Sequence, residues 1–394
     1  MSIVKYPGGK ERELNTISKY LPKEINSYYE PFVGGGSVYL NVKADRYFIN
    51  DFSSDLINLY TCVKKQDTDF FRSLDEVNTV WKNADSYFDK DCESQNSLIS
   101  IYEKYKNSEI DENELCKNLE NYIVVNSEKL IDIIKPLGVG EYTVFTKEFS
   151  RTIKQKTIRM KVLEFNKKHL PDEDVKENLR GTIKASVYMY MRHLYNHQAH
   201  RTNGFKAMLY LFIRDMCYSS MFRFNADGEF NVPYGGISYN AKNYDNTIKK
   251  YKDEALLGKM SKTVIANKDF ETFLKEYKPS KNDFLFLDPP YFKTEDGCQF
   301  NTYNKLDFDI SDQERLATYL IEECDGNFMV DIQYAPEIEN LYKEGTICKN
   351  GNPLNILYFD KKYSVSFMNR NEKTTEHMII RNYKEEGEDG CLIN

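Results

Sequence analysis

The run Phe-Leu-Phe-Leu at 284–287 ends abruptly in Asp288, Pro289, Pro290 and Tyr291. Four consecutive apolar residues are typical of a buried strand. Proline lacks the N–H group that a strand ladder requires, so two successive prolines end that strand. The sequence therefore predicts a core strand whose carboxyl end carries an acid, two prolines and a tyrosine. In an open α/β sheet, ligands bind beyond the carboxyl ends of the strands.

Further short apolar runs in the two terminal parts of the chain are also typical of strands. The predicted strands cover 27–33, 46–50, 263–267, 284–287 and 327–332, with an antiparallel pair at 363–368 and 377–383. Helical spacing follows two of them: 53–63 begins near Ser53 or Ser54, and 311–323 begins at Ser311, each a favourable N-cap residue. The pattern predicts an α/β sheet that ends in an antiparallel strand pair.

Residues 64–200 break this alternation. The stretch is rich in Lys, Glu, Asn and Tyr, and its apolar residues recur at intervals of three and four, as in helices. Breaks are expected near Pro136 and Pro171. Residues 204–224 add one or two apolar helices, and 225–236 carry the Asp-Gly and Gly-Gly turn signals of a hairpin-like loop. We therefore expect a mostly helical insertion within the α/β sheet.

Charge also separates this insertion from the rest of the chain. We expect one α/β domain formed by 1–62 and 260–394, and an insertion at 63–259 whose basic part is 151–259. That basic part carries a net charge of +9 on a chain whose total is −7. A local basic block is the pattern expected of a phosphate-binding surface. The alternative is a lysine-rich helical face exposed to water.

Other features of the composition narrow the class of protein. With 394 residues, the chain is long enough for two or three domains. Its apolar runs are too short to span a membrane, and residues 1–20 lack the apolar core of a signal peptide. The eight cysteines are scattered, which disfavours a zinc knuckle or a redox pair and favours a reducing cytoplasm. His193, His197 and His200 share a helical face, but no cysteine or acid nearby completes a zinc site, so we expect no metal.

The stretch EPFVGGGS, residues 30–37, predicts a glycine turn between a strand and a helix. Such a turn lets the backbone approach a ligand, and the helix N-terminus offers unpaired N–H groups. Asp51 ends the next predicted strand, where an acid can hold ribose hydroxyls. Together they indicate an adenosine-containing ligand, either a nicotinamide cofactor or S-adenosylmethionine, with a tight structural turn as the alternative. The earlier stretch YPGGK, residues 6–10, offers a ring and a cation, but by itself it also fits a flexible terminus.

The Asp-Pro-Pro-Tyr end of the predicted strand supplies two acceptors and a flat ring. Asp288 is one acceptor, and the Pro289 carbonyl is the other because Pro290 keeps it out of a ladder. Tyr291 adds a ring on which a planar group can stack. An exocyclic amino group of a base has two N–H donors, so the motif suits a planar amine. The alternative is a turn with a packing tyrosine.

Five motifs occur in order along the chain: YPGGK, EPFVGGGS, NDFSSDL, RFNADGEFNVPYG, and DPPY followed by FNTY. Their combination resembles the DNA adenine-N6 methyltransferases of the Dam-like group. The resemblance covers both ends of the chain and 204–236, but not most of 64–200. It implies a Rossmann-like methyltransferase sheet, S-adenosylmethionine as cofactor, double-stranded DNA as substrate and a helical insertion for DNA recognition. It also suggests a bacterial or phage-encoded cytoplasmic enzyme, monomeric rather than an obligate oligomer, with a cognate restriction endonuclease as a candidate partner.

The resemblance implies residue roles, matched motif by motif. The expected cofactor contacts are Tyr6, Gly8, Gly9, Lys10, Glu30, Pro31, Phe32, Gly34, Gly36, Ser37, Asp51, Asp269, Phe270 and Asp288. The expected catalytic residues are Asp288, Pro289, Pro290 and Tyr291. The expected DNA contacts are Arg223, Asn225, Asn231, Phe300, Tyr303, Lys154, Lys156 and Arg159. For the DNA contacts, bracing of a hairpin, a solvated face or core packing is the competing interpretation.

These roles imply methyl transfer to N6 of an adenine flipped out of the duplex. Asp288 and the Pro289 carbonyl would accept the two N–H groups and aim the nitrogen lone pair, while Tyr291 would stack on the base. Two alternatives stay open: a methyltransferase of a protein or RNA amide or amine, and a DNA-binding regulator without turnover. The recognised bases are not determined, with GATC as a guess from the family.

The segment after the predicted strand 327–332 departs from the family pattern. Family members usually show a small polar and acidic cluster there, whereas this chain has Asp331, Gln333 and Tyr334. We therefore assign no role to these three residues from the resemblance.

Overall fold

The computed structural model describes residues 2–90, 92–167, 169–291, 308–363 and 373–384. The chain forms two compact units. The first, here called the sheet unit, is Met1–Lys64 with Glu254–Asn394, and the second, the helical unit, is Lys65–Asp253. The sequence predicts the corresponding boundaries at 62/63 and 259/260.

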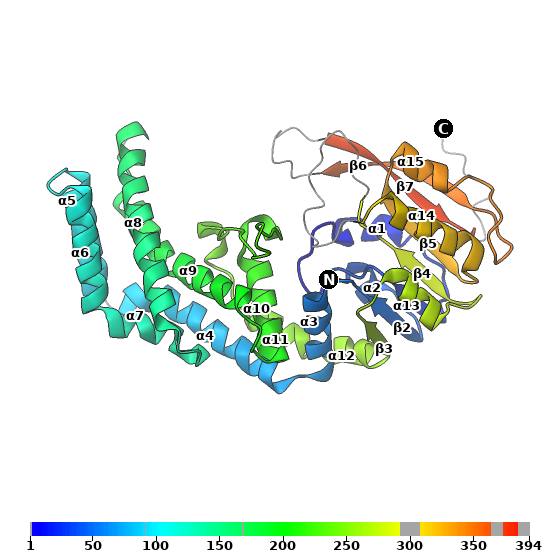
Figure 1. The fold of residues 1–394 in the computed structure, drawn as a ribbon, viewed down its shortest axis with the longest axis horizontal. Helices are drawn as coiled ribbons and strands as arrows, with labels where there is room; N and C mark the ends of the chain where they lie inside the picture. Colours follow the sequence, from blue (N-terminus) through cyan, green and yellow to red (C-terminus); the bar gives the residue numbers. More distant parts are fainter. Residues whose placement is uncertain (1, 91, 168, 292–307, 364–372, 385–394) are drawn as a thin grey trace. The chain divides into compact units, whose positions relative to one another are not determined.

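Seven strands form one sheet in the sheet unit (Figure 1). They are β1 (Ser27–Glu30), β2 (Arg46–Asn50), β3 (Thr263–Ala266), β4 (Phe284–Leu287), β5 (Asn327–Gln333), β6 (Asn355–Tyr363) and β7 (Lys373–Arg381), in the order β3-β2-β1-β4-β5-β7-β6. The first five strands pair in parallel, and β7 pairs antiparallel with both β5 and β6. The predicted α/β fold with an antiparallel C-terminal pair is therefore confirmed. Strand β6, Asn355–Tyr363, was not predicted, and the predicted strand at 363–368 lies outside the described residues apart from Tyr363.

Short helices connect these strands. They are a 3₁₀-helix (Lys10–Arg12), α1 (Leu14–Ile17), α2 (Ser37–Asn41), α3 (Ser54–Lys65), α12 (Glu254–Ser261), α13 (Phe270–Tyr277), α14 (Ile310–Thr318) with a π-helical continuation (Tyr319–Glu323), and α15 (Pro336–Leu341). The predicted Ser311 cap of the helix near 311–323 is wrong. Asp309 caps α14 instead, since its carboxylate accepts the backbone N–H groups of Ser311 and Asp312. Asp309 is the N-cap residue, two positions before Ser311, and from there its carboxylate reaches these N–H groups directly.

The central strands are apolar because both of their faces are covered. All four residues of β4 are buried. Leu285 and Leu287 belong to one buried cluster together with Phe273 of α13 and Leu316 of α14. Each buried leucine or phenylalanine contributes roughly 1.5–3 kcal/mol to folding through removal of apolar surface from water. This continuous apolar character is typical of parallel strands packed between helices.

The strand order reverses at one point along the sheet. Strand β1 lies between β2 and β4. The chain passes from β1 to β2 and β3 on one side, and then crosses to β4 and β5 on the other side. In such sheets, ligands bind outside the carboxyl ends of the strands where the order reverses. The glycine turn after β1 and the Asp-Pro-Pro-Tyr end of β4 flank this point.

The helical unit has the mostly helical structure that the periodicity predicted. Its main helices are α4 (Thr68–Lys90), α5 (Cys92–Lys106), α6 (Glu112–Val125), α7 (Ser127–Ile134), α8 (Tyr142–Lys167), α9 (Asp172–Asn196), α10 (Asn203–Met216) and α11 (Asp245–Tyr251) (Figure 1). A 3₁₀-turn spans Lys135–Leu137, and Pro171 directly precedes α9, so the two expected breaks are confirmed. Trp81 and Phe212 meet edge to face in its core.

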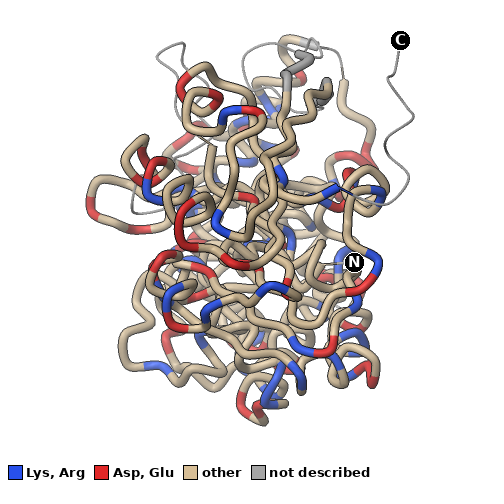
Figure 2. Tube along the Cα trace, turned by 90° about the vertical axis from the view of Figure 1, so that its right-hand side faces the viewer, with Lys and Arg blue, Asp and Glu red and all other residues tan. Residues whose placement is uncertain are grey.

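Acidic residues of the helical unit pair with much of its basic block. Lys154 of α8 binds Glu112 of α6 at 3.2 Å. Further basic residues of the block pair with acids from 63–150, in the pairs Arg180–Asp89, Lys184–Asp85 and Arg201–Glu141. These basic and acidic residues, which lie apart in the sequence, thus form ion pairs in the fold. In the sheet unit, basic (blue) and acidic (red) residues are likewise interspersed along the chain (Figure 2).

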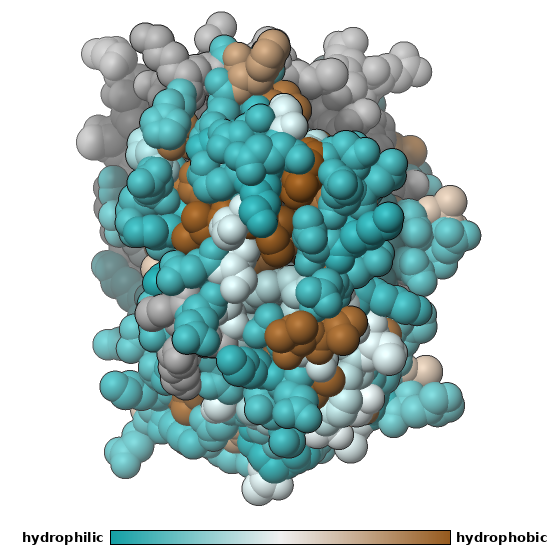
Figure 3. Space-filling model, turned by 90° about the vertical axis from the view of Figure 1, so that its left-hand side faces the viewer, coloured by the Kyte–Doolittle hydropathy of each residue, from teal (hydrophilic) through white to brown (hydrophobic). Residues whose placement is uncertain are grey.

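The helical unit also exposes some large apolar side chains. Val124, Val125, Val162 and Phe165 are examples. On the face drawn in Figure 3, apolar groups (brown) are interrupted by hydrophilic ones (teal). Among the described residues, no helix has the length and apolarity needed to cross a membrane.

Candidate active site

The expected cofactor and catalytic residues of the sheet unit gather at the carboxyl edge of neighbouring strands. Phe32 follows β1 and Asp51 follows β2. Asp269 and Phe270 come after β3, and Asp288 comes directly after β4. Because β3, β2, β1 and β4 are adjacent and parallel, these ends lie side by side. Motifs that are far apart in the sequence therefore share one edge.

Lys10 joins the N-terminal motif to the end of β4. Its Nζ lies 3.1 Å from Asp288 Oδ1 and 3.1 Å from Asp331 Oδ2, and it donates to the Tyr291 hydroxyl at 3.3 Å. Glu13 Oε2 is 3.5 Å away. Lys10 is only 2% exposed, so it is part of the interior and not of a flexible terminus. Paired charges of this kind are the condition under which an ammonium can be buried.

The protonation of Lys10 follows from these neighbours. Burial by itself lowers the pKa of the ammonium, but Asp288 and Asp331, with Tyr291 and Glu13, together raise that pKa well above its ordinary value. Lys10 is therefore a fixed positive charge at neutral pH. Three acidic side chains therefore surround one ammonium group.

The glycine turn is shaped by close contacts with its neighbours. Gly34 has φ +46°, and a Cβ there would lie 3.1 Å from the Tyr6 ring. Gly36 has φ +74°, and a Cβ there would clash with the Tyr60 hydroxyl. Both backbone conformations are in the left-handed region that favours glycine. The backbone N–H of Lys10 donates to Ser37 Oγ at 3.1 Å, so the N-terminal motif and the glycine turn form one structure.

Asp51 connects the glycine turn to the start of α3. Its Oδ2 accepts the N–H of Gly34 at 3.0 Å, and its Oδ1 accepts the N–H of Ser53 at 2.9 Å. Both carboxylate oxygens are therefore engaged by backbone N–H groups of the two neighbouring segments. The structure thus holds this acid in a fixed orientation at the end of β2.

Glu30 has a different environment from the other expected cofactor contacts. The Tyr28 hydroxyl donates to its Oε2 at 2.6 Å inside the sheet. Burial raises the pKa of the Glu30 carboxyl well above its ordinary value, although the bond from Tyr28 opposes this. Glu30 is 3% exposed, and its side chain braces β1 from within.

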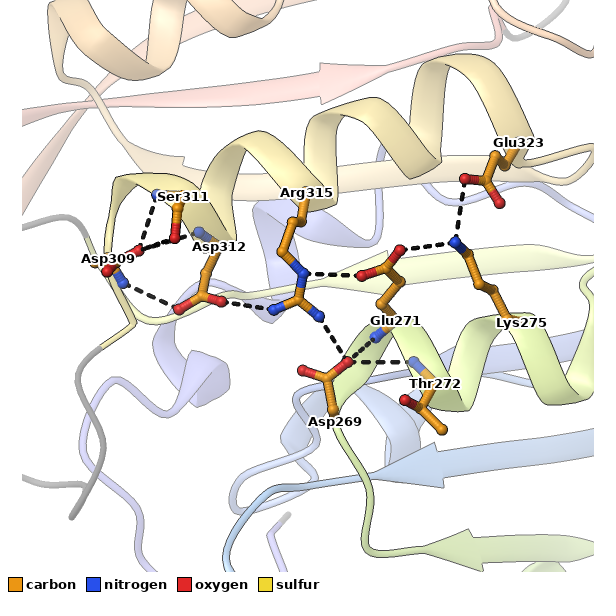
Figure 4. A network of polar contacts seen from close by, with 9 residues as sticks. All are labelled: Asp269, Glu271, Thr272, Lys275, Asp309, Ser311, Asp312, Arg315 and Glu323. Atoms are coloured by element: carbon orange, nitrogen blue, oxygen red, sulfur yellow. Dashed lines mark hydrogen bonds and ion pairs between the residues drawn. The ribbon is translucent and has the colours of Figure 1, made fainter.

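Arg315 organises the start of α13, where Asp269 and Phe270 lie (Figure 4). Asp269 Oδ1 accepts the N–H groups of Glu271 and Thr272, and it also accepts Arg315 Nη2 at 2.8 Å. Arg315 makes further bonds of 2.8 Å to Glu271 and Asp312. Its guanidinium lies over the Phe270 ring, 4.9 Å from the centroid. Arg315 was not predicted, because Asp269 and Glu271 become its neighbours only through the packing of α14 on α13.

An aromatic cluster adjoins this network. The rings of Phe32 and Phe308 meet edge to face at 5.6 Å, and Phe270 lies 5.6 Å from Phe32 and 5.7 Å from Phe308. Flat apolar groups of this kind suit a heterocyclic base. Phe32 and Phe270 were expected near the cofactor, whereas Phe308 was not.

The Asp-Pro-Pro-Tyr motif is held by two elements. Gln313 of α14 is buried and donates to the Pro290 carbonyl at 3.0 Å. The Tyr291 ring meets His377 of β7 edge to face, with centroids 5.6 Å apart. Within the described residues, no donor bonds the Pro289 carbonyl. The motif therefore presents an acid, a carbonyl and a ring in fixed positions.

The expected DNA contacts on the hairpin brace each other. Arg223 Nε donates to Asn231 Oδ1 at 3.0 Å. Asn225 Oδ1 accepts the N–H groups of Asp227 and Glu229, which closes the turn. These bonds agree with the competing structural interpretation of these side chains.

The basic candidates on α8 differ in their surroundings. Lys154 pairs with Glu112, and Arg159 is exposed. Burial lowers the pKa of Lys156, and the neighbouring Arg159 lowers it further. Phe300 and Tyr303 lie outside the described residues.

The histidine group has polar protein partners. His193 Nε2 lies 3.2 Å from Glu141 Oε2, and the rings of His193 and His197 stack at 4.2 Å. Among the described residues, no group of three or more metal-ligand side chains is placed to hold a metal ion.

The sheet order, the glycine turn and the Asp-Pro-Pro-Tyr end together define an α/β enzyme of the methyltransferase fold, with its polar site at the carboxyl edge of the sheet. A family model described as D12 class N6 adenine-specific DNA methyltransferase matches residues 6–365. The chain belongs to this family and is an adenine-specific DNA methyltransferase. This assignment removes the alternatives of a protein or RNA methyltransferase and of a regulator without activity.

Curated relatives agree with the family. The chain is 26% identical over 325 residues to the Type II methyltransferase M.MjaIII of Methanocaldococcus jannaschii. The aligned region covers 80% of this chain and 78% of the relative. It is 23% identical over 348 residues to the Type II methyltransferase M1.LlaDCHI of Lactococcus lactis subsp. cremoris, covering 88% and 85%. It is 24% identical over 322 residues to a DNA adenine methylase of Serratia marcescens, covering 80% and 76%.

Proposed function

We propose that this enzyme takes its methyl group from S-adenosylmethionine, and that Asp288, Pro289 and Tyr291 hold the target adenine after it has flipped out of double-stranded DNA. The observation that carries the proposal is the clustering of Asp288, Tyr291 and Asp331 around Lys10, beside the glycine turn. Together these groups form one polar site at the reversal point of the sheet.

The residues present fit S-adenosylmethionine. Asp51 is oriented to accept ribose hydroxyls, and the aromatic cluster of Phe32, Phe270 and Phe308 offers apolar faces for an adenine ring. The acidic side chains of Asp288, Asp331 and Glu13 near this edge suit a cationic sulfonium. When bound, S-adenosylmethionine supplies an electrophilic methyl group. Tyr6, Gly8, Gly9, Gly34, Gly36 and Ser37 would shape the remaining wall.

Asp288 and the Pro289 carbonyl are suited to the two N–H groups of adenine N6. Lys10 fixes the Asp288 carboxylate through Oδ1, and the ring structure of Pro290 fixes the Pro289 carbonyl. Accepting both hydrogens favours a tetrahedral nitrogen whose lone pair points away from the two acceptors. The nitrogen would then form its new bond to the methyl carbon as the bond between that carbon and the sulfonium sulfur breaks, leaving a neutral thioether, and it would lose one proton to solvent. Orientation of this kind can lower the barrier by about 7–11 kcal/mol.

Tyr291 would offset part of the cost of flipping. Removing a base from the stack costs a few kcal/mol. Stacking on an aromatic side chain contributes about 1–3 kcal/mol per base. The Tyr291 ring is held at its hydroxyl by Lys10 and at its edge by His377.

For target recognition we propose the helical unit and its hairpin at 225–236. Arg223 and Asn231 carry groups that can read base edges. Lys154, Lys156 and Arg159 of α8 would contact phosphates, with affinity that falls as salt rises. We further propose a cytoplasmic monomer, with a cognate restriction endonuclease as a candidate partner in view of the Type II names of two relatives.

Incubation with labelled S-adenosylmethionine and unmethylated DNA, followed by digestion to nucleosides, tests the donor and the product. We expect label in N6-methyldeoxyadenosine, and sequencing of the product locates the methylated site. Asp288→Ala should abolish incorporation, whereas exposed Asp253→Ala serves as a matched control. Absence of label with the folded wild-type enzyme, or full activity of Asp288→Ala, would refute the proposal.

A further inference from the structure

Asp331 and His377 form a buried polar pair behind the Asp-Pro-Pro-Tyr motif. Both side chains are 0% exposed. Asp331 lies opposite Ile379 in the β5–β7 ladder, and His377 lies opposite Gln333, so the two are diagonal neighbours on one face. His377 Nδ1 is 3.6 Å from Asp331 Oδ1, which is longer than a hydrogen bond, so this contact is electrostatic.

The pair closes a ring of contacts around Tyr291. Asp331 Oδ2 lies 3.1 Å from Lys10 Nζ, and Lys10 donates to the Tyr291 hydroxyl at 3.3 Å. The other end of Tyr291 meets His377 with ring planes at 80°. His377 in turn contacts Asp331, which completes the ring of contacts. The tyrosine is thus held at its hydroxyl and at its ring edge by groups that also contact one another.

The alternation of the strands shows which face carries this ring of contacts. Val330 and Ile332 of β5, with Met378 and Ile380 of β7, belong to the apolar core. Asp331 and His377 occupy intervening positions, so they point to the opposite face, toward Lys10 and Tyr291. Burial of a carboxylate and an imidazole is costly unless partners compensate for lost water. Apolar side chains would stabilise the same strands without this cost.

We infer that Asp331 and His377 are positioning residues, which hold Lys10 and Tyr291 so that the ring is already oriented when the target adenine arrives. The inference rests on the proposed stacking role of Tyr291. Orientation before binding removes the entropy that would be lost on ordering the ring in the complex. Neither residue touches substrate, and each acts through Tyr291 or Lys10.

A double-mutant cycle between His377 and Tyr291 tests this inference. His377→Leu, Tyr291→Ala and the double variant are compared for base flipping on a duplex with 2-aminopurine in place of the target adenine that the labelling experiment identifies, and for kcat on the same duplex with adenine at that position. We expect His377→Leu to reduce the flipped-base fluorescence and to lower kcat about tenfold, with an unchanged KM for S-adenosylmethionine. In the Tyr291→Ala background, the same change should have no further effect. Asp331→Asn, which preserves shape, should act in the same direction.

Ile380→Val on the core face of β7 is the control for a merely structural effect. It should lower Tm while kcat and fluorescence stay at wild-type values. Equal losses from His377→Leu with and without Tyr291 would overturn the inference, as would a His377→Leu enzyme with normal fluorescence and kcat. If Tyr291→Ala itself leaves the fluorescence unchanged, the stacking role in the proposed function fails instead.

Discussion

Lys10 Nζ donates a hydrogen bond to the Tyr291 hydroxyl at 3.3 Å, across 281 positions of the sequence. The same ammonium contacts Asp288 and Asp331. One buried cation therefore joins the N-terminal motif, the end of β4 and strand β5. We expect these contacts of Lys10 to contribute both to the stability of the enzyme and to the orientation of the hydrogen-bond acceptors at the end of β4.

Replacement of Lys10 by methionine should impair both properties. The change leaves the carboxylates of Asp288 and Asp331 without their shared cation, which we expect to cost about 3 kcal/mol in the free energy of unfolding. Loss of orientation should lower kcat about 100-fold. Urea denaturation and methyl-transfer assays measure the two effects, with exposed Lys19→Met as the control. A Lys10→Met enzyme with normal kcat would contradict the assigned role.

Gly36→Ala should weaken donor binding. The new Cβ would meet the Tyr60 hydroxyl, and φ +74° is unfavourable for alanine. We expect at least a tenfold rise in Kd for S-adenosylmethionine by calorimetry. Gly258→Ala on α12 is the matched control, since a Cβ there meets nothing within 4 Å, and it should stabilise the helix by about 0.5–1 kcal/mol. Equal effects of the two substitutions would show that the turn geometry is unimportant.

Arg315→Gln should weaken the binding of S-adenosylmethionine and leave the rate of methyl transfer unchanged. The change removes the bonds to Asp269 and Asp312 and the contact with the Phe270 ring. Because Arg315 is 40% exposed, water screens these pairs and the effect on stability should be below about 1 kcal/mol. We expect KM for S-adenosylmethionine to rise several-fold at unchanged kcat. Lys275→Gln, whose partners are Glu271 and Glu323, should leave that KM unaltered (Figure 4).

Glu30→Gln should stabilise the enzyme increasingly as pH rises. Burial raises the pKa of Glu30 in the folded state above its ordinary value of 4.5. The wild-type stability from this group is therefore fully present below about pH 4.5 and declines as pH rises toward the folded-state pKa. Glutamine keeps an acceptor for Tyr28 and has no charge to bury. The difference in Tm between the variant and wild type should grow between pH 4.5 and 8, and exposed Glu24→Gln should show no such trend.

Several elements followed from local sequence. The strands at 46–50 and 284–287 were predicted at their observed bounds, because apolar runs bounded by turn residues leave few other structures possible. The break at Pro171 likewise follows from the missing N–H of proline. Strand β6 was not predicted: its short apolar run, 356–359, is followed directly by three charged residues, and the predicted strand at 363–368 lies outside the described residues apart from Tyr363.

The sequence by itself determined the family, the α/β sheet, the helical insertion and the residues at the strand ends, because each depends on neighbouring residues or on ordered motifs. Only the tertiary structure decided which distant groups meet. It placed Asp331 and His377 beside Tyr291, assigned Arg315 to three carboxylates and paired the basic block with acidic helices. Which strands or helices contact one another depends on the order of the sheet and on packing. Neither can be predicted from a local pattern of residues. The sequence did not show that Lys10 is a buried and paired charge, because its partners Asp288, Asp331 and Tyr291 are brought around it only by the fold.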